Sequence, residues 1–171
     1  EYGAVLKEGL YEDAERKETL LDLCRFSTNE SEDPISLSQY LEKMPENQKD
    51  IYYISAETSA QALASPHLEG FKSKNVPVLI MTDAIDQFWL PMVGSFKEMK
   101  FTSITQGKIN LDELDAESKN KDKDKKENKE KQDKEFVDLI AQLKVVLGDQ
   151  VKDIRLSSKL TDSPVCLVAD E

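Results

Sequence analysis

Short apolar runs alternate with amphipathic stretches between residues 33 and 107, and this alternation constrains the fold more than any other feature of the chain. Ile51–Ile54, Val76–Met81 and Phe101–Thr105 are rich in residues that favour β-strands. The segments between them carry apolar residues at helical spacing. This strand–helix order favours parallel strands joined by crossover helices. We therefore expect an α/β fold in which residues 33–107 form a small three-layer α/β/α domain around a short, mostly parallel sheet.

Two capping-box patterns and one proline mark where helices begin in this region. Ser36 with Gln39, and Thr58 with Gln61, have the spacing at which two side chains satisfy backbone N–H groups reciprocally at a helix start. Pro66 suits the first turn of a helix, where its missing N–H costs no hydrogen bond. These signals predict helices that begin near residues 37, 59 and 66.

The segment from residue 83 to residue 96 carries a long apolar stripe at helical spacing. Its members are Ile85, Phe88, Trp89, Met92, Val93 and Phe96. Pro91 lies inside the stripe and cannot donate to the carbonyl of Gln87, so we expect a kink or a break there. Such a stripe is commonly a core face, but two adjacent aromatic residues cannot point the same way. An exposed aromatic and methionine patch would suit adaptable binding of apolar segments.

The remainder of the chain is expected to form three further parts. Residues 1–32 are expected to be a helical connector, with a partial helical stripe over 7–26. Residues 108–135 carry nearly balanced lysines and carboxylates, typical of a charged, partly helical connector. Residues 136–171 are expected to be an incomplete α+β domain, with an amphipathic helix that ends at Gly148 and strands at Val151–Leu156 and Val165–Val168. The absence of an initial Met suggests a piece of a larger protein.

Composition excludes several classes of function. With 23 basic and 34 acidic residues the net charge is −11, which disfavours nucleic acid and anionic membranes as partners. Cys24 and Cys166 are far apart and favour free thiols in a reducing, cytoplasmic compartment. The single histidine, His67, cannot supply a zinc site or a convincing triad. The glycines do not form a phosphate-binding loop, so we expect no metal, no cofactor and no catalytic residue in this chain.

Asp83 leaves an alternative function open. It follows the apolar run 76–81, at the edge where open α/β sheets bind ligands, as a phospho-accepting aspartate does in a receiver domain. That chemistry needs an acidic pair for Mg²⁺ after an earlier strand, and only Glu57 is found there. The simpler alternative is that Asp83 or Asp86 caps the following helix. A plain interaction scaffold is the third possibility.

Several strings resemble the heat shock protein 90 family. Lys7-Glu8-Gly9, the stretch from Ile35 through Ile51-Tyr52-Tyr53-Ile54, and Ile85-Asp86 followed by an aromatic residue are similar to family segments in the same order. Val151–Leu156 and Leu160–Pro164 resemble the opening of the family's C-terminal domain, and Ser65–Glu69 resembles the bacterial branch. By this resemblance, the chain covers the end of the middle domain and the start of the C-terminal dimerisation domain.

The resemblance implies a segment of an ATP-dependent, homodimeric molecular chaperone that binds and remodels non-native client proteins. The nucleotide pocket, with ATP and Mg²⁺, would lie upstream, and the main dimerisation helices would lie downstream. This piece would therefore contribute client contact and interdomain coupling, without ATP hydrolysis of its own. Phe88 matches the family's client-binding aromatic position, and Trp89 and Met92 are carried over beside it. Gln87, where the family usually has Glu, and Pro91 depart from the family's pattern.

Overall fold

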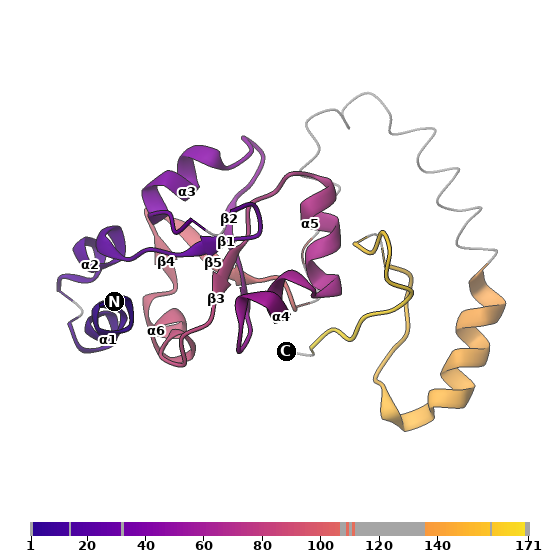
Figure 1. Ribbon diagram of the computed structural model, residues 1–171. Coiled ribbons are helices and arrows are strands. Elements are labelled where there is room, and N and C mark those ends of the chain that lie inside the picture. The colour runs from indigo at the N-terminus through magenta and orange to yellow at the C-terminus, as the bar shows by residue number, and fades with distance from the viewer. Residues whose placement is uncertain are drawn as a thin grey trace. The chain divides into compact units, whose positions relative to one another are not determined.

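The computed structural model describes residues 2–13, 15–31, 33–106, 109, 111, 136–157 and 159–169. The chain divides into two compact units, one of residues 1–114 with 159–171 and the other of residues 115–158 (Figure 1). The first unit is built on a five-stranded sheet. The predicted α/β class is confirmed.

The sheet has the strand order β1-β3-β2-β5-β4. Its strands are β1 (Ser27–Thr28), β2 (Asp50–Ser55), β3 (Leu79–Met81), β4 (Ser95–Phe96) and β5 (Met99–Ser103). The central strand β2 runs parallel to β3 and to β5, as the crossover pattern predicts. The antiparallel edge strands β1 and β4 were not predicted, because two residues are too few to show an alternating pattern.

Helices cover both faces of the sheet, so the predicted three-layer arrangement is confirmed (Figure 1). On one face lie α1 (Gly3–Glu12), α2 (Lys17–Leu23), α3 (Leu37–Lys43) and α6 (Asp86–Val93). On the other lie α4 (Ser59–Leu63), the 3-10 turn Pro66–Leu68 and α5 (Glu69–Ser73). Alternate residues of β2 serve the two cores, with Ile51 in the first and Tyr52 in the second.

The N-terminal residues form two helices where the sequence predicted one helical stretch. Asp13 separates them, because its carboxylate accepts a hydrogen bond from the backbone N–H of Arg16 at 3.1 Å. Leu10, Leu21 and Phe26 are buried in the same core as α3 and α6. These residues of the predicted helical connector 1–32 thus pack onto the α/β layer.

The predicted helix starts are largely confirmed. Ser36 and Gln39 form the reciprocal capping box at α3. At α4 only half of the box forms: the Thr58 hydroxyl accepts from the backbone N–H of Gln61, whereas the Gln61 side chain accepts from Glu57. The Ser65 hydroxyl caps the turn that Pro66 begins.

Helix α6 is shorter than its apolar stripe. It ends at Gly94, whose φ of +67° suits glycine, and Phe96 belongs to β4 instead. A tight turn at Lys97 and Glu98, both with positive φ, joins β4 to β5. The predicted break at Pro91 does not occur, because the helix continues to Val93. Pro91 lies so near the end that it costs the helix only the hydrogen bond to Gln87.

The strands predicted near the C-terminus do not form. In the second unit, residues 136–147 are helical and Gly148, with φ of +47°, ends the helix as predicted, but residues 151–156 are not a strand. In the first unit, residues 165–168 are not a strand either, and pairing there is limited to a bridge between Gln106 and Ala169. Isolated strands are unstable without neighbours. The predicted charged connector 108–135 lies outside the described residues, except for 109 and 111.

Candidate functional site

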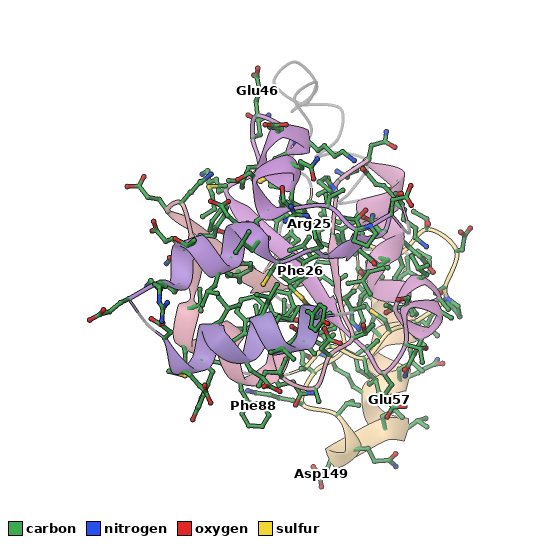
Figure 2. All side chains as sticks on the ribbon, turned by 60° about the vertical axis from the view of Figure 1, so that its left-hand side comes forward. Arg25, Phe26, Glu46, Glu57, Phe88 and Asp149 are labelled. Carbon is green, nitrogen blue, oxygen red and sulfur yellow. The ribbon has the colours of Figure 1, made fainter. Side chains whose placement is uncertain are left out.

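Helix α6 presents an apolar edge to the surface. Phe88 and Met92 are each 60% exposed, and Pro91 between them is also exposed. Their spacing of three and four residues places them on one side of the helix. Figure 2 shows the Phe88 ring pointing away from the body of the unit. We call Phe88, Pro91 and Met92 the α6 ridge.

The opposite side of α6 is fixed in the core. Trp89 is fully buried, and Leu90 and Val93 are buried beside it. The Trp89 ring meets the edge of Phe101 at 5.4 Å between centroids and lies 6.1 Å from Phe26. Trp89, predicted with Phe88 and Met92 as a binding residue, therefore lies in the interior, where it holds the helix while the other two face solvent.

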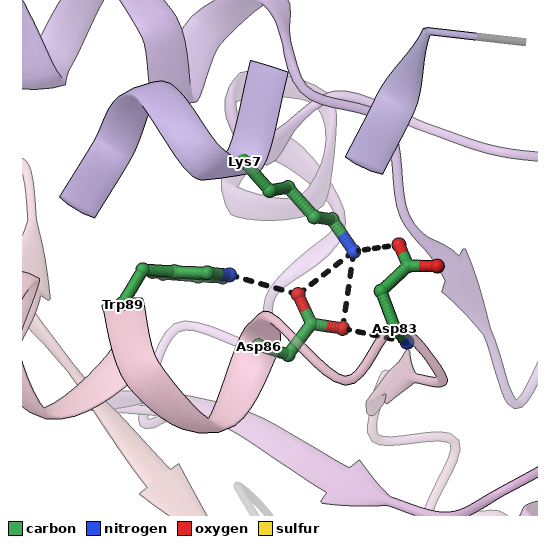
Figure 3. Close-up of polar contacts among 4 residues, drawn as sticks. All are labelled: Lys7, Asp83, Asp86 and Trp89. Carbon is green, nitrogen blue, oxygen red and sulfur yellow. Dashed lines mark hydrogen bonds and ion pairs between the residues drawn. The ribbon is translucent and has the colours of Figure 1, made fainter. Parts of the chain in front are cut away.

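A charged cluster of Lys7, Asp83 and Asp86, in which Lys7 and Asp86 are buried, holds α6 in position (Figure 3). Lys7 of α1, only 4% exposed, donates to Asp83 at 2.8 Å and forms an ion pair with Asp86 at 2.8 Å. Asp86, 1% exposed, accepts from the Trp89 indole N–H at 2.8 Å and from the backbone N–H of Asp83 at 3.1 Å. The lysine ammonium and the two carboxylates thus pair with one another, and buried charges are tolerated in proteins when they are paired in this way.

The cluster joins three parts of the chain into one rigid support. Lys7 also lies 4.9 Å from the centre of the Phe26 ring, a distance suited to a cation–π contact. Asp86 ties the lysine to Trp89, and Trp89 lies next to Phe88 along the helix. The rotation of α6, and hence the direction in which the ridge points, is therefore set from α1.

Asp83 was considered above both as a phospho-accepting residue and as a cap of the following helix. Its carboxylate is paired with Lys7, and no group of three His, Cys, Asp or Glu side chains that could hold a metal ion is found among the described residues. The expected helix cap is wrong in detail. Ile85 occupies the N-cap without a side-chain hydrogen bond, and Asp86 in the first turn accepts from the backbone of Asp83.

Two further side chains considered in the sequence, Cys24 and His67, have shifted pKa values. Burial raises the pKa of the Cys24 thiol to about 11, against the smaller opposing effect of Lys7. Burial also lowers the pKa of His67. Both cysteines are free thiols.

No helix in the described part of the chain is both long and apolar enough to cross a bilayer.

Comparison with known proteins identifies the family. The family description "Hsp90 protein" matches residues 1–171. The chain belongs to the Hsp90 family. It is 45% identical over 170 residues to the chaperone protein HtpG of Roseobacter denitrificans, covering 99% of this chain and 27% of that protein. It is also 45% identical over 171 residues to HtpG of Mycobacterium avium, covering 26% of that protein. The predicted membership of the bacterial branch is confirmed.

A solved structure agrees with this Hsp90 assignment. The middle domain of a Plasmodium falciparum heat shock protein matches with a TM-score of 0.58 and 37% identity, over 62% of this chain and 45% of that one. The chain spans about a quarter of the length of its HtpG relatives. Phe88 and Met92, which the sequence singled out as candidate binding residues, are exposed, whereas no pattern in the sequence indicated that Lys7 is buried beneath α6. A lone lysine in an amphipathic helix carries no signal that it is buried.

Proposed function

We propose that this chain is the client-contacting and coupling segment of an ATP-dependent, homodimeric Hsp90 chaperone, and that the α6 ridge contacts apolar segments of non-native proteins. The observation that carries the proposal is the pair of large apolar side chains, Phe88 and Met92, exposed side by side on a helix whose other side is anchored. Similarity to HtpG chaperones supports the general role.

The chemistry of the ridge suits varied apolar partners. An aromatic ring offers a large rigid surface, and the flexible thioether of methionine adapts to differently shaped side chains. Because Trp89 and Asp86 fix the helix, the ridge is held out for contact without losing core packing. Such preorganisation lowers the entropy cost of binding.

The parent protein would supply what this chain does not. We propose that ATP and Mg²⁺ bind in an upstream domain, that dimerisation depends mainly on downstream helices, and that this segment does not hydrolyse ATP. The two free thiols fit the proposed cytoplasmic location. Closure of the dimer would change client affinity only through a difference in how the two states meet the client.

The test is a double variant, Phe88→Ala with Met92→Ala, in the full-length parent protein. Binding of a permanently unfolded, reduced protein is measured by fluorescence anisotropy, together with basal ATP turnover. We expect the affinity to fall about tenfold or more, since two exposed apolar anchors each contribute about 1 kcal/mol. Basal ATP turnover should not change.

Gln87→Ala is the matched control, because Gln87 is exposed on the same helix but is not part of the ridge. It should leave client affinity unchanged. If the folded double variant binds the unfolded protein as well as the parent does, the ridge has no part in client contact, and a plain scaffold becomes the better account of this segment.

A further inference from the structure

The carboxylate of Glu69, at the start of α5, gathers four donors from residues 161–163. The backbone N–H groups of Thr161 and Asp162 donate to it at 2.8 and 3.0 Å, and that of Ser163 donates at 3.1 Å. The Ser163 hydroxyl donates to the same carboxylate. Three consecutive backbone N–H groups that converge on one anion form a nest, an arrangement that favours negative charge.

The next residue, Gly70, lets the same loop approach α5 closely. A Cβ atom at Gly70 would lie 2.6 Å from the carbonyl oxygen of Lys159 and 2.6 Å from the Leu111 side chain. The backbone of Lys159 cannot move away from such a contact as easily as the end of a flexible side chain can. Glu69 and Gly70 together therefore form a receiving surface for the loop of residues 159–163.

The contact of Glu69 and Gly70 with residues 159–163 lies at the point where the chain returns to the first unit. Residues 115–158 form the second unit, and residues 159–171 belong to the first again. The returning segment keeps Val165 and Leu167 largely exposed. Its other described anchors include the bridge at Ala169, whose N–H donates to Thr105 at 3.3 Å. Hydrogen bonds thus hold it more than apolar burial does, which is typical of segments that open locally.

We propose that Glu69 is a latch that holds the segment 159–169 against α5 and releases it as one piece. With the latch closed, the returning segment stays on α5 directly after the point where the second unit ends. With the latch open, residues 159–169 lose their hydrogen bonds to Glu69 and to Thr105. The latch is separate from the α6 ridge and does not depend on client binding.

Charge controls the latch. The donors from Ser163, Asp162 and Thr161 lower the pKa of Glu69 to about 2, from an ordinary value of 4.5. The interaction is therefore complete at neutral pH and is lost as the pH falls from about 4.5 through 2. The loop already carries Lys159 and Asp162, which offset each other in charge. A further negative charge at Ser163, whose hydroxyl donates to Glu69, would repel the carboxylate and open the latch at neutral pH.

The test measures amide hydrogen exchange by NMR in the 171-residue chain. Glu69→Ala should raise the exchange rates of the amides of residues 161–163, and of the Ala169 amide, at least tenfold. Ser163→Asp should do the same by repulsion. Ser163→Ala keeps the three backbone bonds and should have a much smaller effect. Glu57→Ala, at an exposed carboxylate near α4, should have none.

Amides of the central strand β2 report on global unfolding and should exchange at the parent rate in every variant. Unchanged exchange at residues 161–163 in Glu69→Ala and Ser163→Asp would overturn the latch. Faster exchange there with an unaltered Ala169 amide would overturn release as one piece. If Glu69→Ala does not fold, the carboxyl carbon of Glu69 is titrated in the parent chain: a pKa near 2 supports the latch, and one near 4.5 overturns it.

Discussion

Apolar side chains are buried in one region of this chain and exposed in another. In the α/β layer, Ile51 and Leu79 are fully buried, in strands that have neighbours on both sides. In the runs 151–156 and 165–168, which were predicted to be strands, no strand forms, and Val165 and Leu167 are 73% and 81% exposed. The local patterns are similar. The difference is that backbone N–H and C=O groups in the first region have strand partners, whereas those in the second do not.

The largest effect should come from breaking the charged cluster in the packed region. Lys7→Met keeps the length of the side chain but leaves Asp86 buried without its cation. We expect the free energy of unfolding to fall by about 3–5 kcal/mol, the usual cost of leaving a buried charge unpaired. Urea denaturation followed by Trp89 fluorescence measures this.

Two controls sharpen that prediction. Adding Asp86→Asn to Lys7→Met removes the unpaired charge and should recover much of the loss, because both partners are then neutral. Lys144→Met, which removes an exposed ion pair with Asp153 in the second unit, should leave the denaturation midpoint of the first unit unchanged. Equal effects of Lys7→Met and Lys144→Met would contradict the contrast between the regions.

A smaller effect is expected from truncating leucines. Leu79→Ala, in the fully buried strand β3, should lower the free energy of unfolding by about 2–5 kcal/mol through lost burial and the cavity left behind. Leu167→Ala should change it by less than about 0.5 kcal/mol, since the side chain already faces water. A comparable cost at both positions would show that Leu167 is buried in solution.

The smallest effect is chemical and leaves the fold intact. With the Cys24 pKa raised to about 11, on the order of one thiol in a thousand is ionised at pH 8, and the sulfur is buried as well. Cys166 is partly exposed. Iodoacetamide at pH 8 should therefore label Cys166 first, as peptide mass spectrometry would show. Faster labelling of Cys24 would contradict the packed core around α1 and α2.

Local signals in the sequence predicted much of the α/β layer. The capping box at Ser36 and the apolar runs of β2 and β3 predicted their elements because tertiary packing there agrees with local preference. The turn at Lys97 and Glu98 could not be predicted, since neither residue is typical of positive φ. Nor could the edge strands, whose pairing is decided by neighbours distant in sequence.

The candidate site was predicted only in part. Helical spacing placed Phe88, Trp89 and Met92 on one helix, but spacing cannot say which side of a helix meets the core. That choice depends on Lys7, 79 residues from Asp86 in the chain, and on the indole bond that Asp86 accepts. Leu90, which the stripe omitted, replaces Phe88 on the buried side.

The most direct test of the account is photo-crosslinking from the α6 ridge. A photoreactive phenylalanine analogue replaces Phe88, and in a matched chain it replaces the exposed Glu57, before mixing with a reduced, permanently unfolded protein. We expect strong crosslinking from position 88, weak crosslinking from position 57, and loss of the crosslinks from position 88 when excess unlabelled unfolded protein competes. Equal crosslinking from both positions, or none from position 88, would contradict the account.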